Sequence, residues 1–477
     1  MEQTFEARFL SARRAVIAAR FQNLNEMQRE GVLTTQGPLL LLAGAGSGKT
    51  TVLINRIANL IAFGEGSDSN EIPEYIAEAD VTYLEDYLKT RDPAMQQQAE
   101  RLCALRPAAP WSILAITFTN KAANELKARL QALLGDYAMD VWAMTFHAAC
   151  CRILRREIGR LDGYTGRFTI YDTSDSERVM KDILKDFGLD EKSLPPRLAL
   201  SVISKAKDKR QGPEQFSKHA GKSGDYRMDR IAQLYAEYEK RLHEANALDF
   251  DDLIAFTFTL FARYPETRDK WAQRLYYIEV DEFQDSSRRE LRLLQILSAA
   301  HQNLFVVGDP DQNIYEWRGA DVSILVNFDE QFPGAQTIFL NRNYRSSANI
   351  LRVANTLIDH NRNRIKKSLY TTDPNGEAVI HCHAKSEREE GAFLSGEIAK
   401  LHKSGTAYKD MAILYRAGFV SRFVEQALMQ ANIPYTLYGS TRFYDRMEIR
   451  DALAYLSLVN GDDDLALERV INVPKRQ

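Results

Sequence analysis

The sequence predicts an α/β protein built around a parallel sheet. Short apolar runs alternate with helical patterns along the chain, as is typical of parallel strands joined through helices. A glycine-rich segment also stands between one such run and the helical pattern after it. The length of 477 residues is enough for about three domains. The expected strands are Leu39–Ala43, Ile113–Thr117, Val141–Thr145, Tyr276–Asp281, Leu304–Gly308 and Thr337–Leu340.

The glycine-rich segment is Ala43–Thr50, between an apolar run at 38–42 and an apolar-periodic stretch at 52–58. Such a strand, turn and helix start directs backbone N–H groups and the positive end of the helix dipole toward an anion. Lys49 is expected to reach the β- and γ-phosphates, and the Thr50 hydroxyl is expected to coordinate Mg²⁺. A chance glycine-rich turn is disfavoured because the lysine and threonine stand at the correct positions, although alanine replaces the first glycine of the generic pattern. The sequence therefore predicts a nucleoside triphosphate site.

The run Tyr276–Glu282 is a mostly apolar strand that ends in two adjacent acids. An ATPase with a phosphate-binding loop needs acids at this position. Asp281 is expected to hold Mg²⁺ through its water shell, and Glu282 to orient or deprotonate the attacking water. A bare Asp-Glu pair is a weak signal, and this one gains weight from the strand before it and the glycine-rich loop.

The segment 306–319 is dense in polar and aromatic residues. It could be a turn followed by two core aromatics. However, a strand that ends in Gly-Asp-Pro-Asp-Gln places Gln312 near the phosphate end of the sheet, where ligands bind in such folds. Tyr315 and Trp317, with Arg318 beside them, suit stacking on unpaired bases, worth roughly 1–3 kcal/mol per base. An arginine in the segment 340–346 could reach the γ-phosphate.

The strand pattern fades between Arg160 and Asn246, where the sequence becomes rich in charged residues and has a helical pattern. We expect a helical insertion here, in which the basic run 205–210 is a solvated helix face or follows phosphates. A second, acidic insertion at 64–110 is expected to form a small helical excursion on the surface. A further α/β pattern begins near residue 340, with strands expected at 379–383 and 411–415.

Composition limits the class of protein. The net charge of −3 argues against a uniformly basic coat but leaves room for a local basic or aromatic groove. We find neither a signal-peptide pattern nor an apolar run near the ~18 residues of a membrane span. The four cysteines lack metal-ligand spacing, and alternation along a strand explains His381-Cys382-His383 better than a metal site does. A reducing, cytoplasmic setting is expected.

Together these motifs resemble the UvrD/Rep/PcrA family of superfamily 1 DNA helicases over nearly the whole chain. The resemblance implies a RecA-like parallel-sheet ATPase lobe with a helical insertion, plus the start of a second RecA-like lobe. The implied divisions are 1–159 and 247–338 for the first lobe, 160–246 for the insertion and 339–477 for the incomplete second lobe. Further segments that resemble the family's motifs are 24–28, 115–123, 145–147, 248–253, 280–285, 443–446 and 471–476.

The resemblance also implies roles for individual residues. Gln28 and Tyr344 would bind adenine, Gln284 would sense nucleotide, and Arg345 would act as an arginine finger. Lys49, Glu282, Gln312 and Arg345 would be the catalytic residues, with Thr50 and Asp281 at Mg²⁺. The nucleotide loop would comprise Ala43, Gly44, Ala45, Gly46, Ser47, Gly48, Lys49, Thr50 and Thr51. The single-stranded DNA path would be lined by Phe118, Asn120, His147, Tyr315, Trp317 and Arg318.

Three features depart from the family pattern. Thr51 stands where the family usually has an arginine, the 64–110 insertion is outside the usual core, and two later motifs are absent. We therefore expect the chain to bind Mg-ATP, single-stranded DNA and its junctions with duplex, but to show feeble ATPase and no unwinding. The 3′-to-5′ polarity follows from the resemblance only.

Two alternatives stay open. One is a nucleotide-gated DNA-binding or regulatory module without turnover, acting through partners. The other is the helicase part of a helicase–nuclease, although no carboxylate-rich cluster is evident in the sequence. Repair or replication protein partners are possible, and the sequence identifies none.

Overall fold

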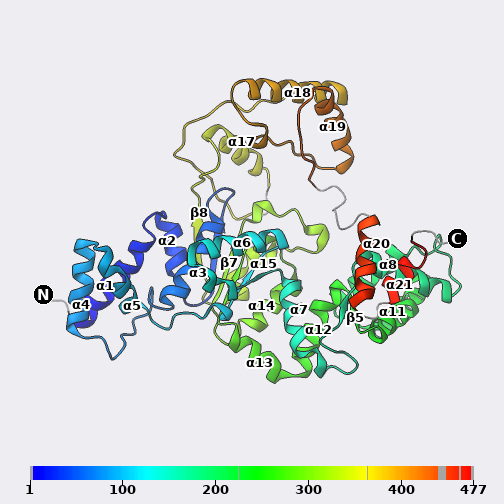
Figure 1. Cartoon of the computed structure of the whole chain (residues 1–477), viewed down its shortest axis with the longest axis horizontal. Helices are drawn as coiled ribbons and strands as arrows, with labels where there is room; N and C mark the ends of the chain where they lie inside the picture. The colour runs from blue at the N-terminus through cyan, green and yellow to red at the C-terminus, as the bar shows by residue number, and fades with distance from the viewer. Residues whose placement is uncertain (1–3, 224, 362–363, 439–446, 461–463, 474–477) are drawn as a thin grey trace. The chain divides into compact units, whose positions relative to one another are not determined.

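The computed structural model describes residues 4–223, 225–361, 364–438, 447–460 and 464–473 (Figure 1). The chain divides into two compact units, Met1–Glu377 and Ala378–Gln477. Each unit is described by itself. None of the described helices combines the length and the apolar character that a membrane crossing requires.

The first unit is organised around a six-stranded sheet with the strand order β3-β2-β6-β7-β1-β8. All neighbouring strands pair in parallel, and the register sets Leu42 beside Gly308 and Ala43 beside Leu340. The strands are β1 Leu39–Ala43, β2 Ile113–Ile116, β3 Trp142–Met144, β6 Tyr277–Val280, β7 Leu304–Gly308 and β8 Gln336–Leu340. The predicted α/β class is therefore confirmed, and the six expected strands are confirmed to within one residue at each end.

Alternation along these strands divides the first unit's main core into two layers. Leu39 and Leu41 of β1 face one apolar cluster, and Leu40 and Leu42 face the other. Because a parallel sheet is covered on both faces, its strands are continuous apolar runs. One layer is formed with α1 Phe5–Arg20, α3 Lys49–Phe63 and α6 Asn120–Leu134. The other is formed with α7 Phe146–Glu157, α12 Phe250–Arg263, α13 Pro265–Arg274 and α14 Arg288–Leu297.

Shorter elements complete the connections of the first unit. They include α2 Glu26–Leu33, η4 Phe283–Asp285, η5 Pro310–Gln312, η6 Glu316–Arg318, α15 Ser323–Val326, α16 Phe328–Gln331 and α17 Ala348–Ile358. The segment 64–110 carries α4 Glu78–Thr90 and α5 Pro93–Cys103, both packed on α1. The remaining 3₁₀ turns are η1 Pro110–Ser112, η2 Asp136–Asp140 and η3 Ile158–Arg160.

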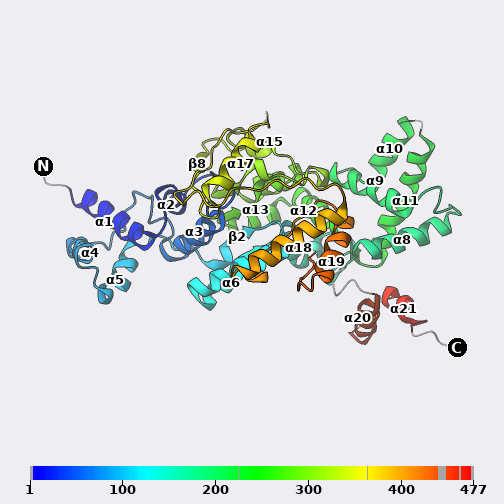
Figure 2. The ribbon, with the colours of Figure 1, turned by 90° about the horizontal axis from the view of Figure 1, so that it is seen from above.

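Four helices occupy most of the segment between Arg160 and Asn246, and Figure 2 shows them grouped together. Where the chain enters and leaves this segment, β4 Thr169–Ile170 pairs in parallel with β5 Ala247–Leu248. The helices are α8 Thr173–Asp186, α9 Pro196–Asp208, α10 Pro213–Ser223 and α11 Tyr226–Glu244. The solvated face expected for the basic run is wrong at Lys207, which is 4% exposed because three carboxylates surround its ammonium group.

The described part of the second unit contains helices and no strand. The strands expected at 379–383 and 411–415 are wrong: neither run pairs with another, and Ile380 and Leu414 are exposed. A strand needs a hydrogen-bonded neighbour, which these described runs lack. The helices are α18 Glu387–Lys403, α19 Ser421–Gln430, α20 Met447–Asn460 and α21 Asp464–Val470, with short turns η7 Tyr408–Asp410 and η8 Gly418–Val420.

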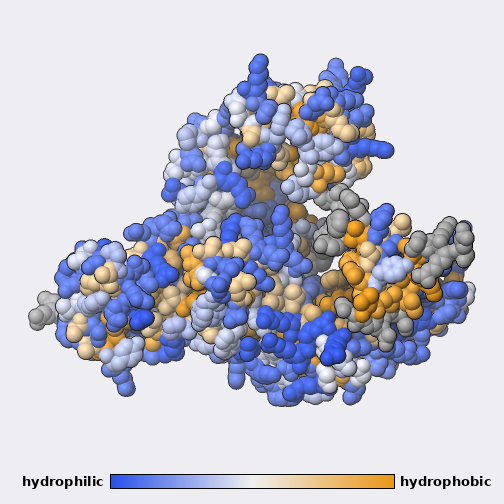
Figure 3. Space-filling model, viewed as in Figure 1, coloured by the Kyte–Doolittle hydropathy of each residue, from blue (hydrophilic) through white to orange (hydrophobic). Residues whose placement is uncertain are grey.

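Exposed apolar side chains gather over α20 and α21 (Figure 3). They include Leu456, Val459 and Leu467. The segment 443–446, which resembles the family, lies outside the described residues. So do residues 474–476 of the segment 471–476.

Candidate active site

The candidate site lies at the carboxyl ends of three neighbouring strands, β1, β6 and β7. Parallel strands bring the loops after their carboxyl ends to one edge of the sheet, where ligands bind in such folds. A cavity of about 400 Å³ opens there. Its lining is Thr50, Thr117, Phe118, Thr119, Ala122, Glu125, Leu126, Asp281, Glu282, Gln284, Asp285, Gln312, Ile314 and Tyr315.

The loop after β1 leaves the start of α3 open. Gly46 and Gly48 have φ values of +66° and +87°, a backbone region that favours glycine. No side chain caps the first turn of α3, which begins at Lys49. Uncapped N–H groups and the positive end of a helix dipole are able to hold an anion. This geometry suits the phosphate-binding loop that the sequence predicts. Thr51 is exposed on the first turn of α3.

Gln28 is held against this loop. Its Nε2 donates to the carbonyl oxygen of Ser47 at 2.9 Å, and its Oε1 accepts from the Asn25 backbone N–H at 3.1 Å in a capping box. A Cβ at Gly48 would lie 2.6 Å from that same Nε2. Glycine is therefore required there both by its φ and by the close approach of Gln28.

The segment after β8 lies on the other side of the loop. The Asn343 amide donates to the Ala45 carbonyl oxygen at 2.6 Å, and the Tyr344 N–H donates to the Gly46 carbonyl oxygen at 2.9 Å. A Cβ on Gly46 would lie 2.6 Å from Cβ of Arg345. The Tyr344 hydroxyl accepts from the Asn25 amide at 2.7 Å. Tyr344 and Gln28 thus share Asn25 as a partner.

The two acids after β6 face Lys49. Its Nζ lies 2.9 Å from Oε2 of Glu282, and the same carboxylate oxygen accepts from the Gln284 amide at 2.8 Å. Burial and the neighbouring Glu282 charge raise the pKa of Asp281 to about 6, against the opposing effect of Lys49. The same two causes raise the pKa of Asp285 to about 6. The Lys49 charge therefore offsets only part of the effect that burial and the Glu282 charge have on these two carboxyl groups.

These groups fit a magnesium ion held largely by phosphate and water. The Thr50 hydroxyl and the Asp281 carboxylate line the same cavity, and Mg²⁺ prefers such oxygen donors. Oδ1 of Asp285 is buried and has no hydrogen-bond partner. The described residues include no group of three or more His, Cys, Asp or Glu side chains able to hold a metal.

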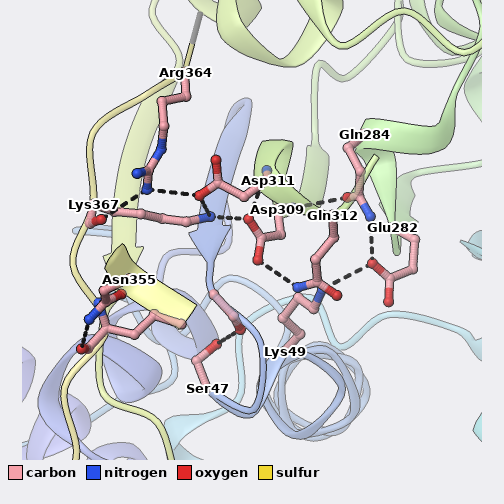
Figure 4. Close-up of polar contacts among 12 residues, drawn as sticks. Ser47, Lys49, Glu282, Gln284, Asp309, Asp311, Gln312, Asn355, Arg364 and Lys367 are labelled. Carbon is pink, nitrogen blue, oxygen red and sulfur yellow. Dashed lines mark hydrogen bonds and ion pairs between the residues drawn. The ribbon is translucent and has the colours of Figure 1, made fainter. Parts of the chain in front are cut away.

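Gln312, which follows β7, lines the cavity, and Figure 4 shows its side chain beside that of Asp309. Its Nε2 donates to Oδ2 of Asp309 at 2.5 Å, and the Asp309 backbone N–H donates to Oε1 of Gln284 at 2.9 Å. A continuous set of contacts therefore runs from Gln312 through Asp309, Gln284 and Glu282 to Lys49.

Aromatic rings lie beside these polar groups. The Phe118 and Tyr315 rings are 4.6 Å apart between centroids, and both residues line the cavity. The Trp317 ring is 6.3 Å from Tyr315 and 69% exposed. Such rings suit base stacking.

Asn120 and His147, which are also expected on the DNA path, are absent from the cavity lining. Asn120 is exposed at the start of α6. His147 lies on α7, with its ring 6.1 Å from that of Phe250. Burial lowers the pKa of His147. The side chain of Arg318 lies outside the described part of the chain.

Sequence reasoning missed several residues of this site. Asn343 fixes both the loop after β1 and the turn that carries Arg345, because its Oδ1 accepts from the Arg345 N–H at 2.8 Å. Its position two residues before the expected arginine was the available signal. Asp285 falls within the family-like segment 280–285 but was given no role of its own. Nothing local marks the distant Lys367, which contacts Asp309.

The comparisons agree with this geometry. A model of the UvrD/REP helicase N-terminal domain matches residues 24–72 and 92–333, and one of the UvrD-like helicase C-terminal domain matches residues 338–477. The chain belongs to the UvrD/REP helicase family. The family match leaves out 73–91, inside the acidic segment.

Two ATP-dependent DNA helicases named PcrA are similar over most of this chain. The helicase of Staphylococcus epidermidis RP62A is 43% identical over 456 residues, which is 95% of this chain and 56% of that protein. The helicase of Staphylococcus aureus Mu50 is 42% identical over 459 residues, 96% of this chain and 57% of that protein. The chain thus spans a little over half the length of these relatives.

Proposed function

We propose that this chain is the ATP-binding and single-stranded DNA-contacting part of an ATP-dependent 3′-to-5′ DNA translocase and helicase. One observation carries the proposal: polar nucleotide-site groups and stacking aromatic rings line a single cavity. Thr50, Asp281 and Glu282 form its polar part, and Phe118 and Tyr315 form its aromatic part. The relatives' description as DNA helicases supports the same assignment.

The proposed nucleotide chemistry follows from the contacts of Lys49 and Glu282. A bound phosphate competes with Glu282 for the Lys49 ammonium group, whose 2.9 Å ion pair then exchanges one anion for another. The Glu282 carboxylate, released from that pair, orients the attacking water and accepts its proton. Mg²⁺, when held by Thr50 and Asp281, would neutralise charge on the phosphates. Arg345, beside Gly46, supplies a further positive charge to the γ-phosphate.

The proposed coupling to DNA follows from the short loop that joins Gln312 to Tyr315. Gln312 faces the polar part of the cavity and Tyr315 stacks near Phe118. A change in the position of Gln312 when the γ-phosphate is bound or lost therefore shifts the ring that holds a base. Gln28 and Tyr344 would hold adenine on the other side of the loop.

We further propose that this 477-residue polypeptide turns ATP over slowly. The Glu282 carboxylate is held by the Lys49 ammonium group at 2.9 Å and by the Gln284 amide at 2.8 Å, and these contacts lower its strength as a base. Proposed ligands are ATP, Mg²⁺ and single-stranded DNA, including junctions with duplex. All four cysteines are free thiols, which suits a reducing, cytoplasmic setting.

ATP hydrolysis by the purified chain, with and without a single-stranded oligonucleotide, tests the proposal beside Lys49→Ala. Slow hydrolysis that DNA stimulates and Lys49→Ala abolishes would support it. Hydrolysis that survives Lys49→Ala would place the chemistry elsewhere and refute the assignment of the site.

A nucleotide-gated DNA-binding module without turnover is the second candidate. The Lys49–Glu282 ion pair favours it, because a carboxylate held on lysine is a poorer base. This candidate predicts nucleotide-dependent DNA affinity together with hydrolysis no faster than that of Lys49→Ala.

A further inference from the structure

Four charged side chains form a buried cluster next to the nucleotide cavity (Figure 4). Asp309 and Asp311 follow β7, whereas Arg364 and Lys367 come from the segment after α17. Their side chains are between 3% and 11% exposed. Lys367 pairs with Asp309 and lies 3.5 Å from Asp311, and Arg364 lies 3.0 Å from the same Asp311 oxygen. The proposed chemistry of ATP uses neither cation.

The Asp309 carboxylate connects this cluster to the cavity. Its Oδ1 accepts from the Lys367 ammonium group, and its Oδ2 accepts from the Gln312 amide at 2.5 Å. A buried carboxylate keeps its charge and place only while a partner compensates it. Lys367 and the Asp311 backbone N–H, which donates to the same Oδ1 at 3.1 Å, together fix the carboxylate that accepts from Gln312. Lys367 itself is absent from the cavity lining.

The backbone around Lys367 is fixed against the phosphate-binding loop. The Tyr370 N–H donates to the Asn341 carbonyl oxygen at 3.1 Å, and the Asn343 N–H donates to the Tyr370 carbonyl oxygen at 2.8 Å. The neighbouring Leu369 packs so closely on Gly44 that a Cβ there would lie 2.1 Å from its Cδ2. The segment that carries Lys367 thus contacts the loops after both β1 and β7.

We propose that Lys367 is a positioning residue for the γ-phosphate contact of Gln312. The ammonium group orients the Asp309 carboxylate, which accepts one N–H of the Gln312 amide nitrogen and leaves the second N–H of that nitrogen to donate to the γ-phosphate. Lys367 thereby connects the position of the segment after α17 to recognition of the third phosphate. This inference rests on the proposed function, because it assumes that Gln312 meets the γ-phosphate.

Nucleotide binding without turnover tests the proposal. Affinities for Mg-AMPPNP, a non-hydrolysable ATP analogue, and for Mg-ADP are measured on the full chain and on Lys367→Met. We expect about a 10-fold loss of affinity for the triphosphate analogue, the size expected when one hydrogen bond to a charged group is lost. The ADP affinity should change less than twofold. Gln312→Ala should show the same selective loss of affinity for the triphosphate analogue. The double variant Lys367→Met/Gln312→Ala should lose no more of this affinity than either single variant does.

Two further variants separate positioning from general stability. Lys366→Met is the matched control, because Lys366 is the exposed neighbour of Lys367 and its loss should change neither affinity. Lys367→Arg retains the charge and should recover part of the triphosphate affinity. Equal losses for ADP and the analogue, or no loss in Lys367→Met, would overturn the inference. If the unmodified chain binds neither nucleotide, the proposed function fails first, and the inference fails with it.

Discussion

Replacing Lys207 with methionine tests a position where the structure differs from the sequence prediction, because a lysine expected on a solvated helix face is buried. The ammonium group on α9 lies 2.6 Å from Asp252, 2.8 Å from Asp249 and 2.8 Å from Glu239. These acids come from α11 and from the start of α12, so the cluster joins the helical insertion to the helix that covers the sheet. Burial lowers the pKa of Lys207, but the three carboxylates outweigh it and hold the value well above its ordinary range.

The expected cost of Lys207→Met follows from this environment. Removing one partner of a buried ion pair costs about 3–5 kcal/mol, because the remaining charge is left without compensation. Burial already raises the pKa of Asp252 and of Glu239, and the loss of Lys207 raises both further. Carboxyl groups with raised native pKa values bind more protons in the folded state, so stability falls as pH rises through those values. The defect should therefore be larger at pH 8 than at pH 5.

Hydrogen–deuterium exchange measures this effect locally, which suits a chain that need not unfold in one step. Protection in α9, α11 and the start of α12 should fall by about 100-fold or more, since ~1.4 kcal/mol is tenfold, while β1 and α3 keep theirs. Lys205→Met is the control, because Lys205 is exposed on the same helix. Unchanged protection in Lys207→Met, or an equal loss in Lys205→Met, would refute the reasoning.

Three other predictions follow from the described residues. Gly48→Ala should lower nucleotide affinity at least 10-fold in a binding titration, because the added methyl group would meet the Gln28 amide and the backbone strain adds about 1–2 kcal/mol. Gly37→Ala is the control for backbone strain alone, because Gly37 has a φ of +76° and open space around it. Burial raises the pKa of the Cys150 thiol to about 12, so a thiol reagent at pH 8 should modify the exposed Cys382 and leave Cys150 intact until the protein unfolds. Burial lowers the pKa of His147, so its NMR titration midpoint should lie below 6.5. The contribution of His147 to stability should be lost as pH falls through that midpoint. A midpoint above 6.5 would contradict its buried environment.

The sheet could be predicted from sequence because its strands are buried on both faces. Leu39–Ala43 and Leu304–Gly308 are unbroken apolar runs, and their bounds agree with the structure. The same reasoning failed at 379–383 and 411–415. An apolar run indicates a strand, but only a paired neighbour makes one, and pairing is not a property of the run itself.

The site was predictable where chemistry and spacing are local. Lys49 and Thr50 follow the glycines that position them, and Asp281 and Glu282 follow a buried strand. Lys367 could not be found this way, because its partner Asp309 lies 58 positions away in the sequence. The residues next to Lys367 in the sequence are typical of a charged surface. Lys207 was hidden for the same reason, since the acids that bury it belong to other helices.

We propose above all that nucleotide and single-stranded DNA meet in one cavity. The most direct test is the anisotropy of a fluorescent single-stranded oligonucleotide titrated with the chain, with and without Mg-AMPPNP, beside Phe118→Ala and Lys49→Ala. Coupling predicts that the analogue changes DNA affinity, that DNA changes analogue affinity by the same factor, and that Lys49→Ala removes both effects. Phe118→Ala should weaken DNA binding and leave affinity for the analogue alone intact. DNA affinity that is the same with and without nucleotide, in a chain that binds both, would contradict the claim.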